Sequence, residues 1–408
     1  MKLRVGFDAR WYNDSGVGTY VAEAIRAMAE IQSANDIELV VYETESTGGR
    51  AAFDGLNVER IVLRSPKYSL GEQFELARRC RLDRLNVLHC PFFMMPFAAP
   101  CPVVITIHDL IPFLFPIYSR AQGLVIRTAY RVAARRAAHI VTVSQNTADD
   151  VQRLLSVPAA KITAVPNAAN SVFACAPATE TAQEQSLLRN KFGITRPYLI
   201  ASSARNWRHK NLEGALTAIE RAAKDVDAKP AGPEFQTIIY GPPDGLIAAG
   251  GATSLSSTTA GSAGLSAGAS GSPAGTNSRW QGIALRHTGY TSAPDLAMLF
   301  RHARAFIMPS LYEGFGLPIL EAMACGCPVI TSNGGSLPEV AGSGAQVFAP
   351  NDVTGMASAL VDLLSSDENF YRWRAAALHR AAQFSWQRTA QETINVYRRV
   401  LSLRSKPL

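Results

Sequence analysis

Metal-binding cysteine patterns are absent from this sequence. The chain has 408 residues and only six cysteines, and no two of them have the CxxC spacing that is common in zinc sites. They stand mainly among apolar or small residues, at positions 80, 90, 101, 175, 325 and 327. We therefore expect buried free thiols in a reducing compartment, without disulfides or a structural metal.

We also expect neither a leader peptide nor a membrane-spanning segment. The first residues, MKLRVGFDAR, alternate like a strand and contain neither a long apolar run nor a small-residue cleavage site. The most apolar stretch, residues 92–118, holds five prolines together with His108 and Asp109, which makes it unsuitable as a helix in lipid. We expect a cytoplasmic protein.

Acidic residues are too few to balance the basic ones. The chain has 40 Lys and Arg against 33 Asp and Glu, a formal net charge of +7. This excess favours an anionic partner, which could be a nucleic acid, a membrane surface or a phosphorylated substrate. Because the sequence has no recognised nucleic-acid-binding motif and no platform of aromatic and basic residues, we expect no nucleic acid.

The length and the pattern of apolar runs predict two α/β domains. A chain of 408 residues exceeds what one core usually serves, and short apolar runs alternate with helical patterns, as in a parallel sheet. The expected strands span residues 3–7, 37–42, 87–90, 103–107 and 140–143, then 198–202, 237–240, 305–308, 329–331 and 346–348. We expect Rossmann-like domains over 1–180 and 190–385, joined near 175–195, and a last helix over 386–408 that could lie across both.

Residues 244–280 interrupt the second domain. This segment is largely Gly, Ser, Ala and Thr and shows no periodicity, so it cannot bury enough surface to hold a fixed structure. It is either a functional flap or a tolerated insertion, and the general tolerance of surface loops favours the second.

The stretch PSLYEGFGLPILEAMACGCPVI, which begins at Pro309, carries the strongest functional signal. A glycine-rich loop with Gly314 and Gly316 runs from a strand into a helix, and the free N–H groups of such a helix terminus suit a diphosphate. Glu313 and Glu321 flank this position, and carboxylates accept hydrogen bonds from the hydroxyls of a sugar or a ribose.

A cationic segment, SSARNWRHKN, follows the first strand of the second half. Its Arg205, Arg208 and Lys210 could neutralise a diphosphate at the carboxyl end of that strand. The alternative is a solvated basic turn.

Two segments of the first half also fall at carboxyl ends of strands. FDARWYNDSGVGTY places Gly16 between a strand and a helix, where glycine permits close approach of the backbone to a ligand. ITIHDLIP places His108 and Asp109 at the end of a buried strand, where a polar pair either caps a helix or lines a cleft.

Taken together, these segments resemble the retaining glycosyltransferases of family 4, whose signature is E-x7-E. The resemblance extends through VSQNTADDV, VPNAAN and GYTSAPDLAMLF, and so covers nearly the whole chain apart from the insertion. It implies the GT-B fold, an α/β architecture in which two Rossmann-like domains face each other across a cleft. The first domain would bind the acceptor, and the second would bind the nucleotide-sugar.

The resemblance also implies roles for individual residues of the second half. Glu313 would bind hydroxyls of the donor hexose and act in catalysis, and Glu321 would bind the ribose. The backbone from Gly314 through Phe315 and Gly316 to Leu317 would contact sugar and phosphate.

The cations of the donor site depart from the family pattern at one position. Arg205 and Lys210 would bind the diphosphate, but His209 stands where the family often has an arginine, so Arg208 could replace Arg205. In the first half, the resemblance places Gly16 near the donor phosphate and His108 near the reacting sugar as a catalytic residue, with Asp109 orienting the loop.

The implied reaction is transfer of a hexose from a nucleotide-sugar to a glycan or lipid-linked acceptor in polysaccharide biosynthesis. Mannose from GDP-mannose is the first choice, and a UDP-hexose is the alternative. A nucleotide-sugar epimerase of the same fold is a weaker alternative for the function, because the E-x7-E stretch is typical of the transferases. We expect no metal and no cofactor, since Asp225 and Asp227 are better interpreted as a helix end than as a metal-binding DxD.

Residues 120–136 combine five arginines with apolar residues and contain no acidic residue. The arginines stand at positions 120, 127, 131, 135 and 136. A helix of this kind either rests on an anionic membrane as a peripheral contact or is an ordinary basic surface helix. The first interpretation would place the protein at the inner face of the membrane.

Overall fold

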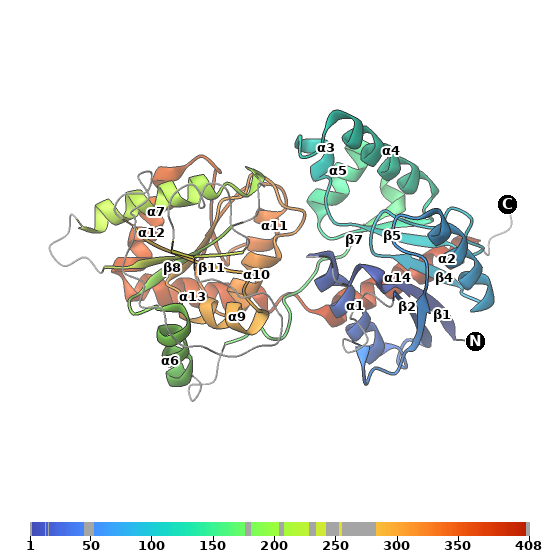
Figure 1. Ribbon diagram of the computed structural model, residues 1–408, viewed down its shortest axis with the longest axis horizontal. Coiled ribbons are helices and arrows are strands. Elements are labelled where there is room, and N and C mark those ends of the chain that lie inside the picture. The colour runs from blue at the N-terminus through green and yellow to red at the C-terminus, as the bar shows by residue number, and fades with distance from the viewer. Residues whose placement is uncertain are drawn as a thin grey trace. The chain divides into compact units, whose positions relative to one another are not determined.

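The computed structural model divides the chain into two compact units (Figure 1). The first unit comprises Met1–Asn170 and Phe384–Leu408, and the second comprises Ser171–Gln383. The structure describes residues 2–12, 14, 16–44, 53–175, 181–203, 208–227, 234–241, 253–254 and 283–404. The chain thus enters the second unit slightly before the predicted junction and returns to the first unit for its last helix.

A parallel sheet forms the centre of the first unit. The order of its described strands is β3-β2-β1-β4-β5-β6-β7, and all pairs are parallel. The strands are β1 (Leu3–Asp8), β2 (Ile37–Thr44), β3 (Glu59–Leu63), β4 (Val87–Cys90), β5 (Val103–Ile107), β6 (His139–Thr142) and β7 (Ile162–Ala164). The central strands are apolar on both faces because helices cover both faces of the sheet.

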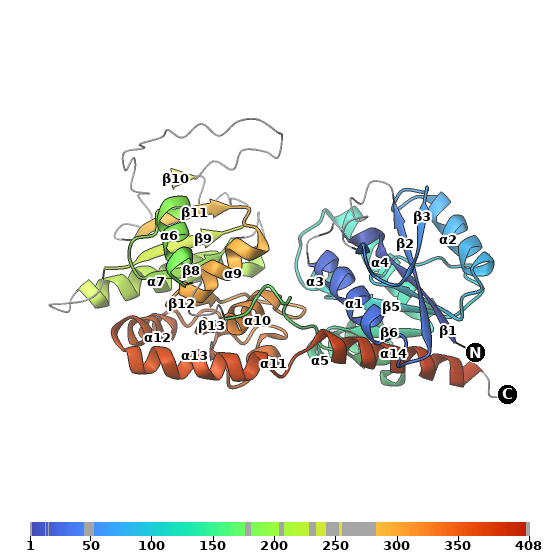
Figure 2. The same cartoon turned by 90° about the horizontal axis from the view of Figure 1, so that it is seen from below.

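Helices α1 and α14 pack on one face of this sheet, and α2, α4 and α5 pack on the other. Figure 2 shows α14 beside α1. The helices of the unit are α1 (Val17–Ile31), α2 (Leu70–Leu82), α3 (Ile111–Leu114), α4 (Arg120–Arg136), α5 (Gln145–Leu155) and α14 (Trp386–Arg404), with short 3-10 turns at Ala9–Trp11 (η1) and Ala159–Lys161 (η4). The last helix therefore completes the core of the first unit.

The second unit repeats this architecture. Its strand order is β10-β11-β9-β8-β12-β13-β14, again parallel throughout the described residues. The strands are β8 (Tyr198–Ser202), β9 (Gln236–Tyr240), β10 (Thr253–Ser254), β11 (Ala284–Gly289), β12 (Ala305–Met308), β13 (Val329–Ser332) and β14 (Gln346–Phe348). The two sheets confirm the predicted class of two Rossmann-like α/β domains.

Helices α7 and α12 pack against one face of this second sheet. The helices of the unit are α6 (Thr181–Phe192), α7 (Leu212–Asp227), α9 (Ala293–His302), α10 (Leu317–Ala324), α11 (Leu337–Ala341), α12 (Val353–Ser365) and α13 (Asp367–Ala381), with a 3-10 turn at Arg208–Lys210 (η5). Asp225 and Asp227 lie in the last turn of α7, as predicted for a helix end.

All ten predicted strands are present, and the described residues contain four others that were not predicted. Three of them, β3, β7 and β10, are edge strands. The fourth, β11, carries Arg286 and His287. The predicted insertion over 244–280 lies outside the described residues except for Thr253–Ser254, which pair with β11 as β10.

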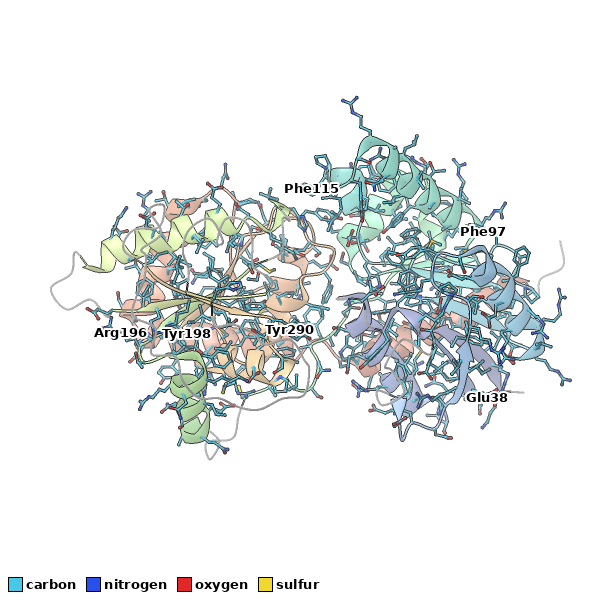
Figure 3. All side chains as sticks on the ribbon, in the orientation of Figure 1. Glu38, Phe97, Phe115, Arg196, Tyr198 and Tyr290 are labelled. Carbon is cyan, nitrogen blue, oxygen red and sulfur yellow. The ribbon has the colours of Figure 1, made fainter. Side chains whose placement is uncertain are left out.

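Because every strand in a sheet runs in the same direction, all carboxyl ends of one sheet meet at one edge. Figure 3 shows this for both units. In the second unit, Arg196 precedes β8 and Tyr290 follows β11, and the two lie at opposite ends of the strands. In the first unit, Glu38 at the start of β2 and Phe115 after α3 are separated in the same way. Loops that follow strands are therefore brought together within each unit.

No helix in the described parts of the chain has the length and the apolar character needed to cross a membrane.

A buried histidine links α14 to the first sheet. The Nδ1 atom of His89 in β4 lies 2.6 Å from the Tyr397 hydroxyl, and its Nε2 atom lies 2.8 Å from the Thr106 hydroxyl in β5. Burial lowers the pKa of His89 to about 3. The ring is therefore neutral at physiological pH, and a neutral imidazole can satisfy both contacts by accepting one hydrogen bond and donating the other.

The replacement Tyr397→Phe should lower the free energy of unfolding by about 1–3 kcal/mol, because it leaves a buried nitrogen of His89 without its partner. Urea denaturation measures this, and Tyr371→Phe is the control because Tyr371 is 64% exposed. Equal stability of Tyr397→Phe and the wild type would contradict the role given to this hydrogen bond.

Candidate functional site

The loop after β12 leads directly into α10 at the carboxyl edge of the second sheet. Gly316 is the N-cap of α10 with φ +94°, Pro318 follows in the first turn, and no side chain caps the helix. The Ile319 and Leu320 N–H groups donate to the Gly316 carbonyl at 3.1 Å and 3.4 Å, and Pro318 has no N–H. The helix dipole still favours an anion at this terminus.

Lys210 and Glu313 meet at this edge. Lys210 Nζ lies 2.7 Å and 2.8 Å from the two carboxylate oxygens of Glu313. The residues come from the loops after β8 and β12, which are adjacent strands. Their side chains are 21% and 9% exposed, so solvent screens this ion pair less than one on the surface. The structure therefore joins two residues that the sequence predicted in separate motifs.

A third loop, which follows β13, holds the backbone of Glu313. The N–H and the hydroxyl of Ser336 both donate to the Glu313 carbonyl, at 3.1 Å and 3.0 Å. Gly335 has φ +60°, and a Cβ at this position would lie 2.5 Å from the same oxygen. Sequence analysis missed both residues, although the segment SNGGS after a strand at the same edge was an available signal.

Glu321 lies one turn into α10 and is half-buried. Burial raises the pKa of its carboxyl group to about 7. At neutral pH this group therefore exists in both protonation states, so it can either accept or donate a hydrogen bond to a hydroxyl. Phe315 in the preceding loop is buried, 5% exposed.

The two arginines of the cationic segment have no described side chain. Arg205 lies outside the described residues, and Arg208 lies in η5 but its side chain is not described. The choice between them as diphosphate ligand stays open. The neighbouring His209 is buried, and burial with the nearby Lys210 charge lowers its pKa to about 4.

In the first unit, His108 lies at the end of β5. Its Nε2 atom is 2.9 Å from the Pro91 carbonyl oxygen, and its ring packs edge-on against Tyr20 at 5.0 Å between centroids. Because a carbonyl only accepts, Nε2 must carry the hydrogen. Burial lowers the pKa of His108 to about 4, so the ring is neutral and Nδ1 is a hydrogen-bond acceptor.

Asp109 and Gly16 shape the loops of this edge. The Asp109 carboxylate accepts from the Ile111 N–H at 2.9 Å, but the N-cap of α3 is Leu110 and no side chain caps this helix. Gly16 is the N-cap of α1 with φ +76°, and a Cβ built on it would meet no atom within 4 Å. Among the described residues, no atom fills the space that a side chain at Gly16 would take.

A charged network at the end of β1 was also missed. Arg10 bonds to the Asp8 carboxylate through Nε and Nη2 at 2.7 Å each, and to Glu72 at 2.8 Å. All three side chains are at most 2% exposed. Three ionisable residues scattered over 64 positions show no pattern in the sequence.

Among the described residues, no group of His, Cys, Asp and Glu is arranged to hold a metal ion.

Comparison with known families gives one match in each part of the chain. The family model described as Glycosyltransferase Family 4 matches residues 15–172. The model described as Glycosyl transferases group 1 matches residues 279–380, which include the loop after β12 and α10.

Curated relatives are similar over a limited part of their length. The O-antigen chain mannosyltransferase B of Escherichia coli is 45% identical over 128 residues, 30% of this chain and 32% of the relative. The MMP alpha-(1->4)-mannosyltransferase of Mycolicibacterium hassiacum is 40% identical over 115 residues, 27% of this chain and 28% of the relative. The chain thus matches about a third or less of the length of these relatives.

Solved structures are similar over the whole chain. A glycosyltransferase from Rickettsia africae ESF-5 superposes with a TM-score of 0.68 at 15% identity, covering 99% of this chain and 100% of that one. HepE of Anabaena, in complex with UDP-glucose, gives a TM-score of 0.69 at 15% identity, with 97% and 100% covered. At this identity the likeness concerns the fold.

The replacement Gly335→Ala should displace the backbone of Glu313 and destabilise the second unit. We expect a loss of about 1 kcal/mol from the left-handed backbone and about 1–3 kcal/mol more from the clash. Gly55→Ala is the matched control, because Gly55 has φ +80° but no atom within 4 Å of an added Cβ. Urea denaturation of both variants tests this, and equal losses would show that the contact with Glu313 has no effect on stability.

Proposed function

Because the chain belongs to glycosyltransferase family 4, we propose that it is a retaining glycosyltransferase that moves a hexose from a nucleotide-sugar to a saccharide acceptor. The observation that carries this proposal is the Lys210–Glu313 ion pair beside the uncapped N-terminus of α10. A cation and the positive end of a helix dipole suit a diphosphate, and the adjacent carboxylate suits sugar hydroxyls.

In this proposal the donor diphosphate lies at the N-terminus of α10 and contacts Lys210. The donor would draw Lys210 partly away from Glu313, whose oxygens then accept hydrogen bonds from hydroxyls of the hexose. Glu321 would bind the ribose, and Arg205 or Arg208 would supply the second cation. These positive groups would stabilise the leaving diphosphate, so we propose that the enzyme needs no metal ion.

The reaction exchanges one bond at the anomeric carbon for another. The bond from this carbon to the phosphate oxygen breaks, and a bond to the acceptor oxygen forms on the same face. The proton of the acceptor hydroxyl passes to the departing phosphate. We propose that His108, neutral and with Nδ1 as an acceptor, binds a hydroxyl of the reacting sugar or of the acceptor.

We propose mannose as the transferred sugar and GDP-mannose as the donor. Two of the relatives are named as mannosyltransferases, and one of them acts on O-antigen chains. This supports a glycan or lipid-linked acceptor in polysaccharide biosynthesis. UDP-hexoses are the second choice, because HepE, which has the same fold, was solved with UDP-glucose.

The donor assignment is tested by thermal shift and by hydrolysis of GDP-, UDP- and ADP-sugars in the presence of EDTA. We expect stabilisation and slow hydrolysis with GDP-mannose. The variant Glu313→Ala should lose transfer by about a hundredfold or more while it still binds the nucleotide, because Lys210 keeps its charge. Lys210→Ala should instead weaken nucleotide binding.

Lys224→Ala is the control for Lys210→Ala, because Lys224 lies on the exposed face of α7 with 70% of its side chain accessible. Unchanged turnover in Glu313→Ala would remove this residue from the site. Strict loss of activity in EDTA would contradict metal-independent transfer.

We further propose that α4 rests on an anionic membrane and brings the protein to a lipid-linked acceptor. Leu124 and Val125 on this helix are 61% and 69% exposed, and Arg120, Arg131 and Arg135 are exposed around them. Apolar side chains can enter the headgroup region while arginines bind lipid phosphates.

Flotation with phosphatidylglycerol vesicles tests this contact. The double variant Leu124→Ser and Val125→Ser should bind at least severalfold less than the wild type, because it removes the apolar part of the surface. Leu187→Ser is the control, since Leu187 is also exposed but belongs to the second unit. No vesicle binding by the wild type would end the proposal.

A further inference from the structure

Tyr68 has an uncommon backbone conformation for an aromatic residue. It lies in the loop between β3 and α2 with φ +65°, a region where the Cβ of an L-residue is strained. Its side chain is 65% exposed, so the strain is not compensated by burial of the ring. Strained residues that the surrounding structure holds in place often belong to functional sites.

The buried charged network holds Tyr68 in this conformation. Its N–H donates to Glu72 Oε2 at 2.7 Å, and the other oxygen of Glu72 accepts from Arg10 at 2.8 Å. Arg10 is anchored in turn on Asp8, the last residue of β1. Because these three side chains are inaccessible to water, the backbone of Tyr68 is held from inside the unit.

The surroundings of the ring combine an apolar support with half-exposed charges. The ring packs edge-on against Trp11, 5.4 Å between centroids, and Trp11 is itself buried. Lys67 Nζ lies 4.7 Å above the Trp11 ring and 2.8 Å from the Asp14 carboxylate. The Lys67 and Asp14 side chains are 28% and 40% exposed, so both can still reach a ligand.

This combination matches the chemistry of a sugar. The C–H face of a pyranose packs on an aromatic ring, and its hydroxyls bond to carboxylates and ammonium groups. The loops after β1 and β3 lie at the carboxyl edge of the first sheet, where ligands of such sheets bind.

We propose that Tyr68, supported by Trp11 and flanked by the Lys67–Asp14 pair, binds a pyranose ring of the saccharide acceptor. This proposal rests on the proposed glycosyltransferase function and names the residues of the first unit that would select the acceptor. Tyr68 is a binding residue in it and takes no part in the bond exchange.

Direct binding is tested without turnover, by saturation-transfer NMR on the full chain. The probes are the methyl glycosides of mannose, glucose and galactose and an α-linked mannose disaccharide. We expect transfer to at least one probe with the wild type, loss in Tyr68→Ala, and recovery in Tyr68→Trp. Tyr371→Ala is the control, because Tyr371 in the second unit is 64% exposed. No transfer to any probe, or equal transfer in Tyr68→Ala, would overturn the proposal.

Kinetics separate this proposal from the proposed function. In Tyr68→Ala the KM for a saccharide acceptor should rise about tenfold, whereas the control Tyr371→Ala should keep the KM of the wild type. An unchanged acceptor KM would overturn the role of Tyr68 and leave the transferase function intact. No donor hydrolysis by the wild type would contradict the transferase function, and the NMR result would still decide whether Tyr68 binds sugars.

Discussion

The parallel direction of all paired strands is the constraint on which both candidate sites depend. It brings the ends of β8, β12 and β13 to one edge of the second sheet, although 134 positions separate Tyr198 from Ser332. The Lys210–Glu313 pair and its support from Ser336 follow from this convergence. In the first sheet the same rule brings together the loops after β1, β3 and β5.

Burial sets the protonation of the groups at these edges. The pKa values of His108 and His209 are lowered because a charged imidazole loses its hydration there, and both rings are neutral at physiological pH. The carboxyl group of Glu321 responds in the opposite direction, since burial also disfavours its charged form. Among the described side chains at the carboxyl edge of the second sheet, the charges of Lys210 and Glu313 balance each other. A ligand that carries phosphate and hydroxyl groups can bind Lys210 through its phosphate and Glu313 through its hydroxyls.

The strands that could be predicted from the sequence are those whose burial requires a run of apolar residues. Central strands such as β5 and β12 are buried on both faces, so their apolar runs are plain, whereas the short edge strands β7 and β10 carry no such run. Glu313 and Lys210 could be predicted as candidate site residues because glycines and clustered charges stand next to them in the sequence. Gly335 and Ser336 were missed because the segment SNGGS indicates a loop at this edge but not its contact with Glu313, more than 20 positions away. The left-handed backbone of Tyr68 has no sequence signal, since glycine or asparagine would be expected there.

The return of the chain to the first unit has a consequence for its synthesis. Helix α14 contributes Trp386, Ile394 and Tyr397 to the core around α1, and Tyr397 also completes the hydrogen bonds of His89. On the ribosome, the residues of the second unit all emerge before this helix does. The second unit can therefore fold while the chain is still growing, whereas the first unit waits with one face of its sheet incompletely covered until α14 has emerged. During that interval the exposed apolar face is the part of the nascent protein most open to chaperones and to aggregation.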